Sequence, residues 1–141
     1  MKKSAFTLIE LLVVIFLMGL ILSIAVLNLS FLKEKEERIE VEKIITSLNN
    51  ARNLAVNSGR STEVILFKNE IYIDGKNFNE NYDLKNTKFL FYYGKHHDRF
   101  YFNPTGAPDL ARTIRLKGKD KIYFITIEIA TGKVNLRYEK N

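Results

Sequence analysis

The stretch Phe6–Leu32, FTLIELLVVIFLMGLILSIAVLNLSFL, decides how the rest of this chain is organised. Between Leu11 and Leu32 it contains no charged residue and no proline. At about 1.5 Å of rise per residue, a helix of this length crosses a hydrocarbon core of about 30 Å. The sequence therefore predicts a transmembrane helix over residues 6–32, with one carboxylate, Glu10, close to its start.

The part of the chain after this stretch is long enough for one small domain. The chain has 141 residues, so the residues that follow Leu32 suffice for a single hydrophobic core. It has no cysteine, which excludes a disulfide framework, a thiolate metal site and a cysteine nucleophile. The formal net charge is +6, and the excess lies in residues 94–141, which hold ten basic and five acidic side chains.

The N-terminal residues admit three interpretations. The basic start at Lys2 and Lys3 favours a cytoplasmic N-terminus and export of the C-terminal part of the chain. The first interpretation is a secretory signal cleaved after Ala25, which releases a soluble domain; the continued apolar run and the charge of Glu10 count against it. The second is an uncleaved anchor, in which Thr7 caps the helix and Glu10 bonds back to the Thr7 backbone in a capping box.

The third interpretation gives the carboxylate an assembly role. Cleavage between Ala5 and Phe6 creates an α-ammonium group on Phe6, at the edge of the apolar layer. A lone carboxylate in that layer costs about 2.5–3.5 kcal/mol, so it needs a cationic partner. The Phe6 ammonium of a neighbouring copy supplies one, and its pairing with Glu10 sets the register between parallel helices.

This N-terminal sequence resembles a known motif. Lys-Lys-Ser-Ala at residues 2–5, followed by Phe-Thr-Leu-Ile-Glu at residues 6–10, resembles the N-terminal motif of type IV prepilins and pseudopilins. The resemblance implies cleavage before Phe6 by a prepilin peptidase and N-methylation of the new Phe6 terminus. It also implies polymerisation with other pilin or pseudopilin subunits through the apolar helix, with Glu10 in assembly. The family usually has glycine before the cut, where this chain has Ala5, the next smallest side chain.

Residues 33–58 predict an amphipathic continuation of the same helix. Apolar residues recur at spacings of three and four, namely Val41, Ile44, Ile45, Leu48, Ala51 and Ala55. Glu34 stands at pairing distance along the helix from Arg38. Glu40 is also at pairing distance from Lys43, and we expect both ion pairs on the solvent face.

From Thr62 onward the pattern is that of short strands joined by tight turns. Residues 63–67 and 70–73 predict a hairpin, whereas the asparagine-rich residues 76–88 are predicted to form a loop. Further strands are predicted at residues 89–93, 100–102, 113–117, 122–129 and 134–138. The predicted fold class is α+β: a long N-terminal helix, transmembrane in its first half and amphipathic in its second, packed on a C-terminal antiparallel β-sheet or small β-sandwich.

The C-terminal segment carries a second resemblance. Phe102-Asn103-Pro104-Thr105-Gly106, the strand that begins at Thr113 and the turn Thr131-Gly132-Lys133-Val134 resemble the globular domain of minor pseudopilins of the general secretion pathway protein H type. Similar minor pilins occur in type IV pilus and competence systems. The resemblance implies a pilin-like fold for the whole chain.

Catalytic and metal-binding patterns are weak in this sequence. Adjacent residues on an extended chain point to opposite faces, so His96 and His97 are interpreted as loop histidines and not as metal ligands. Asp74, Glu80 and Asp83 lack the alternating oxygen ligands of a calcium loop. No glycine-rich phosphate loop or nucleophile elbow is present. We therefore expect no enzyme, no cofactor and no metal.

Basic residues interleaved with aromatic ones in the last third make a nucleic-acid surface one candidate. A positive face at the end of a filament attracts DNA or other anionic polymers, with strongly salt-dependent affinity. The alternative is a solvated, lysine-rich surface with no partner. The candidate DNA-binding residues are Arg112, Arg115, Lys117, Lys133 and Arg137.

The sequence as a whole predicts a minor pseudopilin or type IV pilin-like subunit. Its segments are a prepilin leader (1–5), an assembly helix (6–32), an amphipathic helix (33–58) that ends near Gly59, and a β domain (59–141). The expected location is the bacterial inner membrane, crossed once with the C-terminal domain outside the cytoplasm, and then a pilus or secretion pseudopilus. Expected partners are the processing enzyme, other subunits and membrane lipid, with secreted substrate or DNA considered. The rivals are a DNA-uptake pilin and a monomeric membrane-anchored binding domain.

Overall fold

The computed structural model describes residues 7–91 and 94–140, and for residues 24–31 it describes the backbone alone. The chain divides into two compact units, residues 1–35 and 36–141. Helix α1 (Leu8–Ser58) begins in the first unit and ends in the second. Eight strands follow within the described residues of the second unit.

The described side chains of the first unit form an uncovered apolar helix surface. Every large apolar side chain between Leu8 and Leu22 is exposed, with Val14 the least exposed at 41% and Leu8 the most at 80%. Within the described residues, no helix is both long enough and apolar enough to cross a membrane. The expected span also includes residue 6 and the side chains of residues 24–31, which lie outside the described part.

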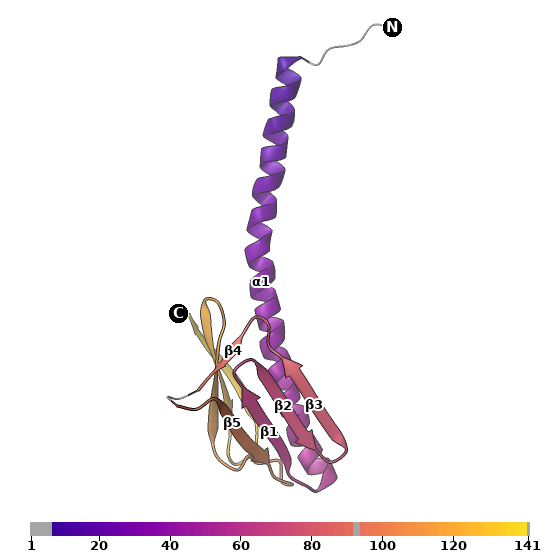
Figure 1. Ribbon diagram of the computed structural model, residues 1–141, viewed down its shortest axis with the longest axis vertical. Helices are drawn as coiled ribbons and strands as arrows, with labels where there is room; N and C mark the ends of the chain where they lie inside the picture. The colour runs from indigo at the N-terminus through magenta and orange to yellow at the C-terminus, as the bar shows by residue number, and fades with distance from the viewer. Residues whose placement is uncertain (1–6, 92–93, 141) are drawn as a thin grey trace. The chain divides into compact units, whose positions relative to one another are not determined.

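Two four-stranded antiparallel sheets make up the β part of the second unit. One has the order β3-β2-β1-β5 and the other β4-β6-β7-β8. Figure 1 shows β3, β2, β1 and β5 side by side, with β2 and β3 in front of the C-terminal part of α1. The first sheet contains β1 (Thr62–Phe67), β2 (Glu70–Gly75), β3 (Phe78–Asp83) and β5 (His97–Phe102). The second contains β4 (Lys88–Leu90), β6 (Arg112–Lys117), β7 (Lys121–Ile127) and β8 (Val134–Lys140).

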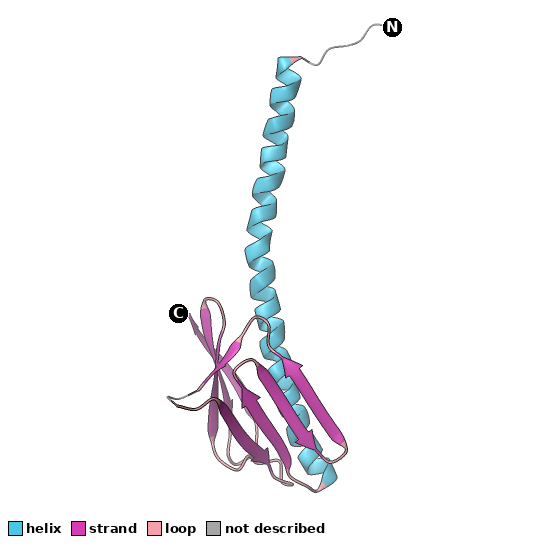
Figure 2. Cartoon of the chain, in the orientation of Figure 1, coloured by secondary structure: helices cyan, strands magenta, loops and turns pink. Residues whose placement is uncertain are grey.

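The core lies between the C-terminal half of α1 and the inner faces of these sheets (Figure 2). Val41, Ile44, Leu48, Ala51 and Ala55 are at most 1% exposed, as their spacing predicts. The predicted α+β fold class, a long helix packed on antiparallel β-sheet, is confirmed. The helix ends at Ser58, and Gly59 follows with a φ of 63°, a conformation that glycine adopts without strain.

The prediction of a loop over residues 76–88 is wrong. Residues 78–83 form β3, an edge strand paired with β2 from Gly75↔Phe78 to Glu70↔Asp83. Its asparagine-rich sequence has low strand propensity, but its inner face makes contacts with the helix. The Lys43 ammonium lies 3.5 Å from the centre of the Tyr82 ring, and the Ser47 hydroxyl donates to the Glu80 carboxylate at 3.1 Å. These contacts stabilise a strand whose outer residues are polar, which also suits an edge.

Candidate functional site

The described N-terminal end of α1 contains a capping box. The Thr7 backbone N–H and the Thr7 hydroxyl each donate to Glu10 Oε2 at 2.9 Å, and the Glu10 N–H donates to Thr7 Oγ1 at 3.4 Å. These bonds satisfy N–H groups that a helix start otherwise leaves unpaired. The predicted cleavage and methylation positions, Ala5 and Phe6, lie outside the described residues. The proposed assembly role of Glu10 stays a prediction.

Of the five predicted DNA-binding residues, Arg112 is turned towards other groups of the domain. Its side chain is 14% exposed and forms an ion pair with Asp98, and its Nη2 lies 3.9 Å from Asp109. Its guanidinium also lies 4.8 Å from the centre of the Phe100 ring. In β6, Arg112 falls in the same alternation as the inward-facing Ile114. Its charge therefore stabilises the contact between β5 and β6.

Three of the predicted basic residues share the outer face of the second sheet. Arg115 and Lys117 alternate with the buried residues of β6. Phe124 of β7 lies opposite Arg115 on one side and opposite Arg137 of β8 on the other. The Arg137 guanidinium lies 5.1 Å from the Phe124 ring and 3.3 Å from Glu139. Lys133 is exposed in the turn before β8. The outer face of the second sheet therefore holds three of the five predicted DNA-binding residues, and Glu139 lies beside Arg137.

Two buried glutamates were not recognised from the sequence as contacts to the sheets. Glu37 and Glu40 are 5% and 3% exposed. Glu40 accepts hydrogen bonds from the backbone N–H groups of residues 85, 86 and 87, at 2.7, 3.0 and 2.6 Å, and from the Thr87 hydroxyl at 2.8 Å. The expected solvent-side pair of Glu40 with Lys43 is therefore wrong, because both side chains bind segments of the β part instead. The available signal was spacing: Glu37 precedes Val41 by four residues, on the buried stripe of α1.

Glu37 binds the turn between β6 and β7. The Lys119 N–H donates to Glu37 Oε2 at 3.0 Å. The carboxylate lies so close to Gly118 that a Cβ at this position would collide with Glu37 Oε1. A larger residue at position 118 would therefore require the Glu37 carboxylate to move. Consecutive turns of α1 therefore fix two loops, the β6–β7 turn and the β3–β4 crossover.

Between these two loops lies an open groove of about 360 Å³. Four of its lining residues are exposed lysines, Lys85, Lys88, Lys117 and Lys119, which we call the lysine groove. The remaining lining residues are uncharged, namely Asn69, Leu84, Asn86, Thr87 and Gly118. The groove therefore has the charge expected of an anion-binding surface.

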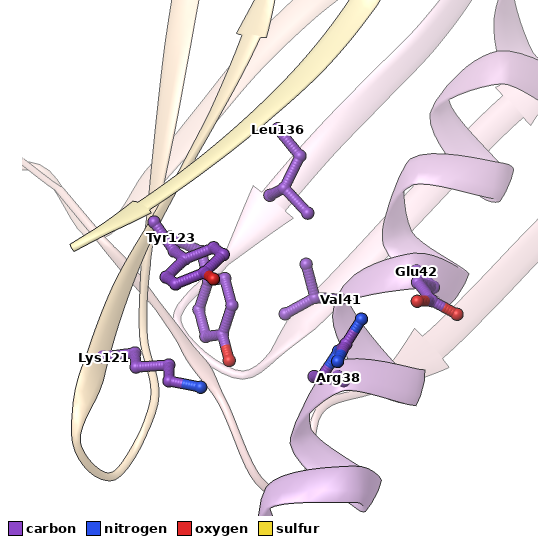
Figure 3. A pocket seen from close by; sticks show the side chains of 7 residues that line it. Arg38, Val41, Glu42, Lys121, Tyr123 and Leu136 are labelled. Carbon is purple, nitrogen blue, oxygen red and sulfur yellow. The ribbon is translucent and has the colours of Figure 1, made fainter. Parts of the chain in front are cut away.

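A smaller hollow of about 110 Å³ lies between α1 and strands β7 and β8. Figure 3 shows Leu136 and Tyr123 on the strand side, with Val41 and Arg38 on the helix side. Leu136 pairs in register with the buried Ile125, so it shares the inner face, yet it is 43% exposed because β8 is an edge strand. The hollow brings no set of catalytic side chains together.

The two adjacent histidines, His96 and His97, lie on an open surface. The His97 ring centre lies 6.0 Å from that of Phe67, and both histidines line the open surface formed by residues 94–99. Among the described residues, no group of three or more histidine or acidic side chains is placed to hold a metal ion. The pKa of Tyr82 is raised, first by burial and then by the negative charge of the nearby Glu40 carboxylate.

Comparison with known proteins gives a sequence-motif match at the N-terminus and a structural match to a solved protein. Residues 1–26 match the family model of the prokaryotic N-terminal methylation motif. Two crystal forms of the type IV minor pilin FimU from Pseudomonas aeruginosa resemble the structure, each at 17% sequence identity, with TM-scores of 0.56 and 0.58. The matches cover 71% and 76% of this chain and 91% and 92% of the FimU chains. No curated protein matches the chain in sequence. The chain therefore carries the methylation motif at its N-terminus and resembles a type IV minor pilin in its fold.

Proposed function

We propose that this chain is a minor subunit of a type IV pilus or a secretion pseudopilus, processed at Phe6 and assembled through its apolar helix. The observation that carries the proposal is the methylation motif at the head of a helix with an uncovered apolar surface. Such a surface is unfavourable in water and needs lipid or neighbouring helices around it. In this proposal residues 6–32 anchor the subunit once in the inner membrane before assembly, with the C-terminal domain outside the cytoplasm.

In this mechanism Glu10 provides the charged contact between adjacent subunits. Its carboxylate pairs with the methylated Phe6 ammonium of an adjacent subunit, which offsets the cost of placing a charge in an apolar layer. The capping box seen in the isolated chain gives the same carboxylate a second role. An experiment on Glu10 must therefore separate helix capping from charge pairing.

The variant Glu10→Gln makes this separation, because glutamine also accepts the capping hydrogen bonds but carries no charge. We expect Glu10→Gln and Glu10→Ala to reduce the subunit in sheared filaments at least tenfold, with an unchanged amount in the membrane fraction. The exposed Glu36→Ala is the matched control and should assemble normally. Normal assembly of Glu10→Gln would reduce Glu10 to a helix cap, and normal assembly of Glu10→Ala as well would favour a monomeric membrane-anchored domain.

A DNA-uptake pilin is the second candidate function. The observation in its favour is the outer face on which Arg115, Lys117 and Arg137 gather around Phe124. Arg112 contributes nothing to that face, since its charge is paired with Asp98. Binding of mixed-sequence duplex DNA at low salt separates this candidate from a subunit without a nucleic-acid role.

A further inference from the structure

The lysine groove has no role in the assembly mechanism. We propose that it binds the phosphate headgroups of anionic phospholipids and holds the globular unit against the membrane surface before assembly. This inference rests on the proposed anchoring of residues 6–32. It assigns a ligand class to a surface that the assembly mechanism leaves unused.

The charge arrangement in the groove calls for an anion. Lys88 in β4 and Lys117 in β6 stand directly opposite each other on the same face of the second sheet. Like charges in this position destabilise a sheet unless a counter-charge lies nearby. Among the described residues, no carboxylate forms an ion pair with any of the four groove lysines. A bound phosphate would relieve the repulsion between them.

The groove is also held in a defined shape. Both of its loops are attached to α1 through buried carboxylates: Glu40 binds the backbone of residues 85–87, and Glu37 binds the backbone of Lys119. These two carboxylates do not line the groove, and their oxygens accept hydrogen bonds from the backbone of its loops. Lys85 and Lys119 project from these attached loops, and Lys88 and Lys117 project from the adjoining strands β4 and β6. A site held in this way loses little conformational freedom when an anion binds, which favours affinity.

The position of the groove along the chain favours a membrane over a nucleic acid. Glu37 follows Leu32, the last residue of the proposed span, by five residues. Five residues reach at most about 18 Å even when fully extended. Because the β6–β7 turn is bound to Glu37, this short connection limits how far the turn can lie from the headgroup layer of an anchored subunit. There, each lysine contributes about fivefold to the affinity for an anionic surface.

The test uses the full chain in nonionic detergent micelles at low salt. Amide NMR signals of residues 85–88, 118 and 119 are followed during addition of short-chain phosphatidylglycerol. Parallel titrations use short-chain phosphatidylcholine, inorganic phosphate and mixed-sequence duplex DNA. We expect saturable shifts with phosphatidylglycerol and markedly smaller shifts with the other three.

Paired variants assign any binding to the groove. Lys85→Gln with Lys119→Gln should raise the half-saturating concentration of phosphatidylglycerol about 25-fold, at about fivefold per lysine. The control pair, Arg60→Gln with Lys76→Gln, removes the same charge near the C-terminal end of α1 and should change it less than twofold. Thermal unfolding of both pairs should match the parent chain, because the backbone bonds to Glu37 and Glu40 are kept.

Each contrary result overturns the proposal. Equal responses to the two lipids would mean that headgroup charge is not recognised. An equal response to inorganic phosphate would make the groove a free-anion site, and a stronger response to DNA would make it a nucleic-acid site. Equal weakening by the control pair would mean that net charge alone acts. Failure of the proposed function is distinguishable: a chain that is not processed at Phe6 or incorporated into filaments still gives these titrations.

Discussion

Glu40 is the side chain on which the crossover between the two sheets depends most directly. Its carboxylate accepts three backbone N–H groups and one hydroxyl while only 3% exposed. Hydrogen bonds to a charged group are worth more than neutral ones, and buried donors that lose their acceptor carry a desolvation cost. The role of Glu40 is thus structural: it fixes residues 85–87 on α1.

We therefore expect Glu40→Ala to lower the free energy of unfolding by about 3 kcal/mol. Urea unfolding of the full chain in detergent, followed by a signal from the β part, measures this change. The matched control is Glu42→Ala, two residues away and exposed on the same helix, which should change stability by less than about 0.5 kcal/mol. Equal stabilities for the two variants would contradict the structural role of Glu40.

At the scale of elements, the β7–β8 hairpin is closed by a hydrogen-bonded carboxylate. Glu128 accepts from the Thr131 hydroxyl at 2.9 Å and from the Asn135 amide at 2.7 Å. These two bonds, with the nearby Lys133 charge, hold the pKa of Glu128 below its usual range. Because the folded pKa is lowered, this stabilisation is present above the unfolded pKa of about 4.3 and is lost as pH falls through the folded pKa.

An NMR titration of the Glu128 carboxyl carbon checks this prediction. We expect its midpoint below that of a glutamate in a model peptide, and we expect Asn135→Ala to move the midpoint upward towards the ordinary value. Asn81→Ala, which removes an exposed asparagine from the other sheet, should leave the midpoint unchanged. A midpoint that does not respond to Asn135→Ala would show that this bond is not made in solution.

For the whole molecule, the mature N-terminus decides among the three interpretations of the leader. We expect mass spectrometry of membrane-extracted protein to find a chain that begins at methylated Phe6. Ala5 stands where the family has glycine, so a minor unprocessed fraction is compatible with slower cleavage. A chain with intact Met1 throughout would leave a plain anchor, and one that begins at Val26 would mean an exported soluble domain.

The sequence by itself determined the features that depend on local chemistry. The methylation motif is a linear pattern within residues 1–26 and needs no folded context to be recognised. The buried stripe of α1 follows from the 3.6-residue helical period, and the end of α1 follows from the backbone freedom of Gly59. The hairpin of β1 and β2 follows from two short runs rich in β-branched and aromatic residues on either side of a two-residue turn.

Only the tertiary structure decided how these elements combine. β4 and β5 are neighbours in sequence but belong to different sheets, and the polar β3 becomes a strand because β2 and α1 provide partners for it. Glu40 leaves the solvent face to bind residues that follow it by 45 to 47 positions, and Arg112 pairs with Asp98 across β5 and β6. The physical reason is common to all of these cases. Their stabilising contacts join segments far apart in the chain, whereas periodicity and propensity report only on near neighbours.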